Sequence, residues 1–211
     1  MSTNSLVAYL NEDGTVVTSY VHYDGYATGV GELLLENYNT DKCARDLAST
    51  LGYASSLKET VADSHIDRAN SDESEVFEDY HAFEEYIREN SYLEYVYAWD
   101  STKVVGGKWL VATWETTKKE VYTDDGLDYE FESHWNGFED LVTVYVREGN
   151  KTVARWRRMV DANRVNEDYL DHANELEINV MKWHKIGMSE VVDNVVSEWR
   201  ENDTMHSIII E

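Results

Sequence analysis

His22 and Asp24 are the residues of this chain whose types and spacing best suit acid–base chemistry. They lie in the segment "VHYDGYATGVGELLLENY", residues 21–38. A histidine titrates near neutral pH and a neighbouring carboxylate can orient it, so the pair is a candidate general base with its partner. The backbone N–H groups of "TGVG" would then face an anion at a helix start.

The same spacing also allows a structural interpretation. On an extended strand, residues 22 and 24 project from one face about 7 Å apart, too far for a hydrogen bond without a bend. Asp24-Gly25 is a turn signal, and "GVG" lacks both the lysine of a P-loop and the third glycine of a dinucleotide fingerprint. We therefore expect a strand–turn–helix scaffold, with His22, Asp24 and His134 as the candidate catalytic residues.

Other catalytic and metal-binding patterns are missing from the sequence. The seven histidines are scattered, no His-Glu-x-x-His occurs, and a single cysteine cannot build a structural zinc site. That cysteine, Cys43, falls on the apolar stripe of an expected helix, and there is no Gly-x-Ser-x-Gly. The sequence predicts no metal site and no cofactor.

The charge of the chain restricts its partners. There are 42 acidic residues against 18 Lys and Arg, a net charge of -24. Phosphate groups attract Lys and Arg, so we expect no direct binding to nucleic acid or to a membrane surface. A host protein with a basic surface is the expected partner.

Carboxylates are concentrated between residues 63 and 100, where twelve acidic residues stand against Arg68 and Arg88. A dense carboxylate face can imitate a phosphate backbone and occupy the basic groove of a nucleic-acid enzyme. The alternative is that these residues only keep the outer surface of the protein hydrated and bind no partner. The expected acidic face consists of Asp72, Glu73, Glu75, Glu78, Asp79, Glu85 and Glu89.

Hydrophobic periodicity predicts an α+β fold with antiparallel hairpins packed with helices and two C-terminal helices. Hairpins are expected from residues 5–10 with 15–23, from 92–100 with 108–115, and from 141–146 with 152–156. Helices are expected over 32–38 and 41–51, from 76 to 89, over 166–186 before Gly187, and from Ser189 onward. The spacing of Ser56 and Glu59 matches a capping box, which marks a helix start.

We expect one acidic domain, residues 1–211, with a mobile insertion at about 62–75, where the chain is rich in Ser, Asp and Asn. No basic leader and no apolar run of ~18 residues is present, which favours a cytoplasmic protein.

The opening segment, with the "DLASTLGYASSL" that follows it, resembles a group of small uncharacterised phage and prophage proteins. The shared elements are His22, Tyr23, Asp24, Gly25, Tyr26, Gly31, Leu34, Tyr38, Leu51, Gly52, Ser56 and Leu57. "EYVYAW" and "GGKWLV" are also similar, so the resemblance covers about half the chain. It departs where Tyr23 replaces Trp and Ala27 replaces Pro, and the residues after about 120 have no counterpart. The resemblance implies a phage or prophage origin and a location in the host cytoplasm. It does not imply any particular activity.

Three classes of function follow. The first is a non-enzymatic phage protein that binds and inhibits a host factor, such as a defence or nucleic-acid-processing protein, through its acidic or aromatic surface. The second is a small hydrolase-like enzyme or ligand-binding protein with a site around His22 and Asp24. The third is a phage accessory or assembly protein that uses aromatic hairpins, with a homodimer as one oligomeric state. We favour the first.

Overall fold

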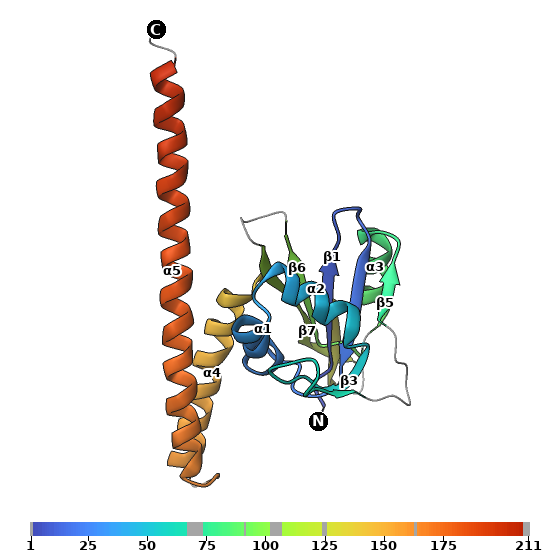
Figure 1. Ribbon diagram of the computed structural model, residues 1–211. Helices are drawn as coiled ribbons and strands as arrows, with labels where there is room; N and C mark the ends of the chain where they lie inside the picture. Colours follow the sequence, from blue (N-terminus) through green and yellow to red (C-terminus); the bar gives the residue numbers. More distant parts are fainter. Residues whose placement is uncertain are drawn as a thin grey trace. The chain divides into compact units, whose positions relative to one another are not determined.

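The computed structural model describes residues 2–66, 74–90, 92–101, 107–123, 126–162 and 164–208. Within these residues a mixed nine-stranded sheet is packed with helices, and two long helices follow it in the chain (Figure 1). This is the α+β fold that the sequence predicts. Contacts between Cα atoms divide the chain into two compact units, Met1–Leu141 and Val142–Glu211. Part of the expected insertion, residues 67–73, lies outside the described residues.

The strand order of the sheet is β4-β3-β2-β1-β6-β7-β8, with β5 paired to β2 and β9 paired to β7. The strands are β1 (Ser5–Leu10), β2 (Val16–Val21), β3 (Tyr53–Ser56), β4 (His65–Ile66), β5 (Glu75–Phe77), β6 (Tyr95–Asp100), β7 (Lys108–Thr123), β8 (Gly126–Trp135) and β9 (Glu139–Asp140). The two predicted hairpins β1–β2 and β6–β7 are confirmed, both antiparallel.

Two parallel pairings complete the centre of the sheet: one joins the two hairpins, and the other adds β3 beside β2. β1 pairs with β6 in parallel, from Ser5 opposite Tyr95 onward, and β2 pairs with β3 in parallel at Tyr20 and Tyr53. Parallel neighbours need long crossover connections, and here these connections contain the helices. The periodicity of the sequence predicts each hairpin but not the pairing between them.

Alternate residues of β1 face two different helical layers. Leu6 and Ala8 belong to a buried cluster with Phe83 and Ile87 of α3 (Tyr80–Glu89). On the opposite face, Ser19 of β2 donates its hydroxyl to Ala48 O of α2 (Asp41–Thr50) at 2.9 Å. Figure 1 shows α2 and α3 on opposite faces of the sheet. Both faces of the central strands are therefore buried, which explains their near-continuous apolar sequence.

The helices around the opening segment start and stop close to where their signals predict. A π-helical turn, η1 (Ala27–Gly31), leads into α1 (Glu32–Asn37). The side chain of Thr40 caps α2 by accepting the Cys43 N–H at 3.2 Å. Gly52, with a φ of +62°, turns the chain from α2 into β3, as expected for a glycine after a helix.

Two local predictions between residues 53 and 89 are wrong because sheet pairing overrides them. Ser56 ends β3 and starts no helix, since the strand pairs with β2. Val76 pairs with Val17 in the strand β5 instead of extending the helix stripe. The helix α3 begins only after Asp79, whose side chain accepts the Ala82 N–H at 2.8 Å.

The predicted third hairpin over residues 141–156 is wrong, because this segment belongs to α4 (Leu141–Asp161). Its β-branched residues favour strands, but Leu141, Val144 and Tyr145 are all buried and recur at helical spacing. The expected break at Gly187 and new helix at Ser189 are also wrong. One helix, α5, runs from Asp168 to Ile208.

The second unit is an antiparallel pair of α4 and α5. Arg157 of α4 donates a hydrogen bond of 2.7 Å to Glu177 of α5. Near the other end of the pair, Gly187 of α5 lies close to Val142 of α4: a Cβ atom added to Gly187 would be 3.2 Å from Val142 Cγ1. The buried face of α5 consists of Ala173, Leu176, Val180 and Trp183. Within the described ranges, none of the helices combines the length with the apolar composition that a membrane span requires.

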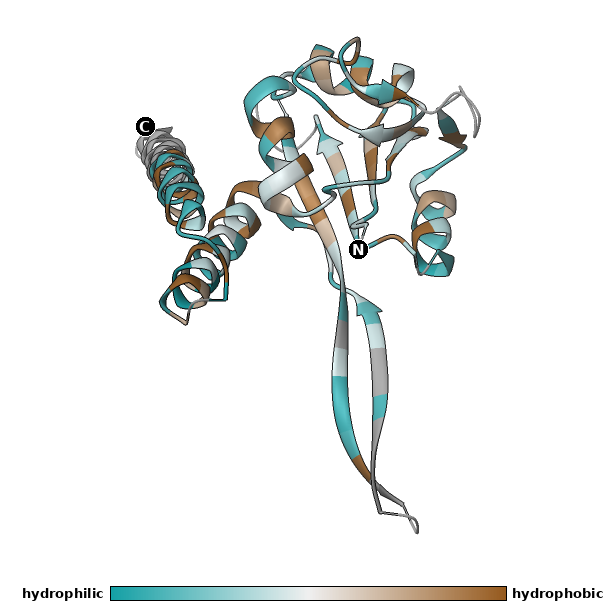
Figure 2. Cartoon of the chain, turned by 90° about the horizontal axis from the view of Figure 1, so that it is seen from below, coloured by the Kyte–Doolittle hydropathy of each residue, from teal (hydrophilic) through white to brown (hydrophobic). Residues whose placement is uncertain are grey.

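The hairpin of β7 and β8 extends past the other strands as a two-stranded ribbon (Figure 2). It pairs without a bulge from Trp114 opposite Trp135 to Thr123 opposite Gly126. The indole rings of Trp114 and Trp135 meet edge to face at its base, 5.2 Å apart. A long β7 of 16 residues thus serves both the sheet and the ribbon.

Candidate functional site

The opening motif forms a compact turn between β2 and η1. Asp24 has a φ of +59°, a conformation that only a few per cent of non-glycine residues adopt. Its carbonyl oxygen accepts the Val30 N–H at 2.8 Å, and the carbonyl of Gly25 accepts the buried hydroxyl of Tyr97 at 2.8 Å. These two bonds fix the turn to its own helix and to β6.

Close backbone approach explains two of the glycines. A Cβ atom on Gly25 would lie 2.6 Å from Thr3 O, and one on Gly29 would overlap the carbonyl oxygen of Asp24. Residues with side chains do not fit at either position. The π-helical turn and the left-handed Asp24 are both features that cluster at functional sites, although here each also has a structural role.

Beside this turn lies a cleft of about 560 Å³, which we call the motif cleft. Its lining is Tyr23, Asp24, Tyr26, Gly29, Val30, Leu33, Ser56, Leu57, Lys58, Glu59 and Asp63. Tyr23 and Tyr26 are exposed over 48% and 39% of their surface, so both rings are available to a ligand. Three carboxylates and one lysine give the cleft a net negative charge.

Tyr26 donates a hydrogen bond within the motif cleft. Its hydroxyl donates to Asp24 Oδ1 at 3.2 Å. Burial, and then the charge of Asp24, raise the pKa of Tyr26 above its ordinary value. The hydroxyl therefore stays protonated at neutral pH, and it holds the carboxylate of Asp24 on the cleft wall.

His22 and Asp24 do not act on each other. His22 Nδ1 lies 3.1 Å from the hydroxyl of Tyr20, and its ring meets Tyr23 edge to face at 4.4 Å. Over the described part of the chain, no hydrogen bond or ion pair joins His22 to Asp24, whose carboxylate is bonded to Tyr26. The structure therefore does not assemble the base and orienting acid that the sequence suggests.

His134 lies elsewhere, near the base of the β7–β8 ribbon. It is exposed at the edge of a second cleft of about 600 Å³, which includes Trp114, Trp135 and Arg88. Asp24 lines the motif cleft and His134 lines this one, so the candidate catalytic residues are not brought together. Within the described ranges, no group of three or more His, Cys, Asp or Glu side chains is placed to hold a metal ion.

A third cleft, of about 540 Å³, is walled by tyrosines, and we call it the tyrosine cleft. Its lining is Leu6, Thr18, Tyr20, Gly52, Tyr53, Ser74, Glu75, Tyr86 and Tyr92. The rings of Tyr20 and Tyr53 lie 4.6 Å apart, and the hydroxyls of Tyr86 and Tyr92 lie 3.1 Å apart. Burial raises the pKa of both Tyr20 and Tyr86, so their hydroxyls remain neutral hydrogen-bonding groups.

The described members of the acidic face surround α3, and all of them are exposed: Glu75, Glu78, Asp79, Glu85 and Glu89. Asp72 and Glu73 lie outside the described residues. Glu75 also lines the tyrosine cleft, and Tyr86 of α3 forms part of its wall, so the acidic face and the tyrosine cleft share Glu75 and the helix α3. The carboxylate of Asp79 also has a structural role, because it caps α3.

The two units share the charge unequally. The first unit carries 29 of the 42 acidic residues and nine of the 18 Lys and Arg, a net charge of -20. The second unit carries the remaining 13 acidic and nine basic residues, a net charge of -4. The sheet-containing unit is therefore the strongly acidic part of the protein.

Sequence reasoning identified one wall of the motif cleft and part of the acidic face. It missed Lys58, Glu59 and Asp63, which follow β3 in the chain and line the motif cleft. The sequence singled out this segment only through the Ser56-Leu57 pair of the resemblance and the capping-box spacing of Ser56 and Glu59. It also missed the tyrosine cleft, whose residues come from several separate segments between Leu6 and Tyr92.

Comparisons of the chain with protein-family models, with curated proteins and with solved structures find no match.

Proposed function

We propose that this chain is a phage-type, non-enzymatic protein that binds and inhibits a host protein through an acidic and aromatic surface. That surface is the acidic face together with the tyrosine cleft. The observation that carries the proposal is that Glu75 belongs to both and that Tyr86 of α3 forms part of the cleft wall. The resemblance to phage and prophage proteins supplies the host context.

The chemistry of this surface suits an arginine or lysine side chain of a partner. A guanidinium or ammonium group is attracted to the faces of tyrosine rings, and neutral tyrosine hydroxyls accept its hydrogen bonds. The exposed carboxylates around the cleft steer a basic partner toward it, and this steering weakens as salt is added. Net charges of opposite sign would thus set the rate of encounter, while the tyrosines would fix the docked side chain.

A basic groove that normally holds nucleic acid is the expected target surface. The net charge of -20 on the first unit opposes direct contact with phosphates but favours the Lys and Arg that bind them. The protein would then act as a nucleic-acid mimic toward a host defence or nucleic-acid-processing protein. Inhibition follows because the groove is occupied.

The first test is a pull-down from host lysate with the full chain as bait, at low salt and at ~0.5 M salt, where exposed charge contacts are heavily screened. The expected result is a nucleic-acid enzyme retained at low salt and released at high salt. Its activity on nucleic acid is then measured with increasing amounts of the chain. A retained protein that keeps full activity would contradict the inhibitory part of the proposal.

Charge reversal then locates the binding surface. The triple variant Glu78→Lys, Glu85→Lys and Glu89→Lys should lose the partner while keeping its fold. The matched control reverses three exposed carboxylates of the second unit, one just before α5 and two on it, with the same change in net charge: Glu167→Lys, Asp171→Lys and Glu175→Lys. Equal loss of binding in both triples would mean that only net charge matters, and the acidic face would be rejected as the site.

A second candidate function is ligand binding in the motif cleft. Its two half-exposed tyrosines and three carboxylates suit a small cation, and its volume of about 560 Å³ is within the range of small-molecule sites. A thermal-shift screen with polyamines and quaternary ammonium compounds tests this. Stabilisation of the native chain that is lost in Tyr26→Ala but kept in Tyr92→Ala would favour the motif cleft over the tyrosine cleft.

A further inference from the structure

Helix α5 carries two apolar seams, each with the alternating three- and four-residue spacing of a coiled coil. The first seam is Ala173, Leu176, Val180, Trp183 and Gly187. Its first four residues are buried, and Gly187 lies against Val142 of α4. This seam packs on α4 and needs no further partner.

The second seam starts five residues later, at Ile178, Met181, Lys185 and Met188. A shift of five residues is about 140° around a helix of 3.6 residues per turn, so this seam lies nearly opposite the first. Ile178, Met181 and Met188 are exposed over 67%, 54% and 55% of their surface. Three large apolar side chains on one line of a helix are thus left open to solvent.

The spacing of the second seam continues along the sequence of α5 through Val192, Val195 and Trp199. Ile178 to Trp199 covers three heptads, and six of the seven a and d positions are apolar. A pattern of this length is typical of a coiled coil and is rare in a helix that only faces water.

The length of α5 also exceeds what α4 can cover. At 1.5 Å per residue, the 41 residues of α5 extend for roughly 62 Å and the 21 residues of α4 for roughly 32 Å. Val142, at the start of α4, lies beside Gly187, so α4 has no residue opposite the part of α5 beyond that point. A helix of about 20 residues is marginally stable in water without packing.

We propose that the second seam of α5 binds the same seam of a second copy of this chain, so that the protein is a homodimer held by a coiled coil. A second copy is the occupant that fits, because a heptad seam is self-complementary and places apolar a and d positions against each other. Lys185 stands at an a position, where a single lysine is known to set register and oligomeric state at a cost in stability. This proposal does not depend on the proposed inhibition of a host protein.

The test is the mass of the full chain in solution, measured by light scattering and by sedimentation over a range of concentrations. The expected mass is twice the 24.4 kDa of one chain. Ile178→Glu should raise the dissociation constant by at least about tenfold, because it would bury an unpaired carboxylate at the seam. Lys185→Leu should lower the dissociation constant, since it makes the seam apolar throughout.

Ile186→Glu is the matched control. Ile186 is an exposed isoleucine of the same helix, about 100° or more from both seams, so the same change should leave the mass unchanged. Circular dichroism of each variant reports whether the helices still form. A wild-type chain that stays at 24.4 kDa at every concentration overturns the proposal, as does an Ile178→Glu variant that associates like the wild type.

Discussion

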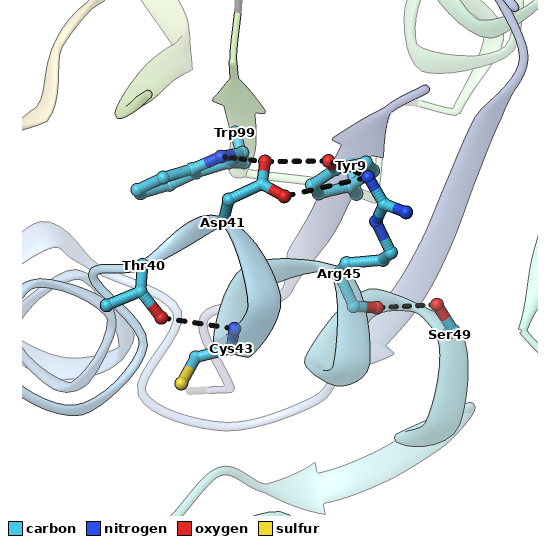
Figure 3. Close-up of polar contacts among 7 residues, drawn as sticks. All are labelled: Tyr9, Thr40, Asp41, Cys43, Arg45, Ser49 and Trp99. Atoms are coloured by element: carbon cyan, nitrogen blue, oxygen red, sulfur yellow. Dashed lines mark hydrogen bonds and ion pairs between the residues drawn. The ribbon is translucent and has the colours of Figure 1, made fainter. Parts of the chain in front are cut away.

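The hydroxyl of Tyr9 on β1 donates a hydrogen bond of 2.7 Å to Asp41 Oδ1 in the first turn of α2. The same oxygen accepts the indole N–H of Trp99 on β6 at 3.2 Å, and Arg45 donates to the Tyr9 hydroxyl at 2.7 Å (Figure 3). One carboxylate therefore ties α2 to the two parallel strands at the centre of the sheet. The rings of Tyr9 and Trp99 are almost fully buried, so their polar atoms depend on Asp41.

Asp41→Ala should destabilise the fold by about 1–3 kcal/mol, because it leaves the Tyr9 hydroxyl and the Trp99 N–H without their acceptor. Chemical denaturation measures the change. Asp46→Ala is the control on the same helix, since Asp46 only pairs with the exposed Lys42 and should change stability by no more than ~0.5 kcal/mol. Equal effects of the two changes would contradict the role given to Asp41.

Gly29→Ala should destabilise the fold by about 1–3 kcal/mol, because the added methyl group would overlap the carbonyl oxygen of Asp24 and the ring of Tyr26. Gly137→Ala adds the same methyl group where no atom lies within 4 Å, and it should be nearly neutral. Thermal unfolding of both variants compares them. A Gly29→Ala chain as stable as the wild type would show that the motif turn relaxes freely.

Asp79→Ala should destabilise the fold by about 1 kcal/mol, because the side chain caps α3 by accepting the Ala82 N–H. Asp79→Ser should retain most of that stability, since a serine hydroxyl also caps a helix. Because Asp79 belongs to the acidic face, the serine variant also separates its two roles. Binding to a partner that persists in Asp79→Ser would assign Asp79 to capping alone.

Stability should fall between pH 10 and 12, and Tyr38 should contribute to the fall. Burial raises the pKa of Tyr38 from its ordinary value of 10.0 to about 12. The folded chain therefore holds this proton more tightly than the unfolded chain, so the contribution is complete below pH 10 and is lost as the pH rises to 12.

Tyr38→Phe tests this assignment, because it removes the titrating hydroxyl and its hydrogen bond of 2.8 Å to Lys58 O. Unfolding free energies of the variant and the wild type, measured from pH 8.5 to 12, should converge as the pH rises. Parallel curves over that range would mean that other tyrosines carry the effect.

Local signals in the sequence predicted the elements whose partners are close in the chain. The β1–β2 hairpin and the helix over 41–51 each depend on a few neighbouring residues, and both are confirmed, the helix as α2. The signals failed where distant pairing competes with them. Val76 has helical spacing with Phe83, yet it joins a strand because β2 offers an open edge to pair with.

The features of the candidate sites also fall into two groups, those predictable from local sequence and those that depend on distant pairing. The sequence alone determined that the chain is strongly acidic, that α3 carries exposed carboxylates and that the opening motif is a turn, because charge and turn chemistry belong to residue types. Only the tertiary structure decided that His22 and Asp24 are bonded to different tyrosines and that four tyrosines from distant segments wall one cleft. The parallel pairings of the sheet brought those segments together, and periodicity within a single segment carries no information about them.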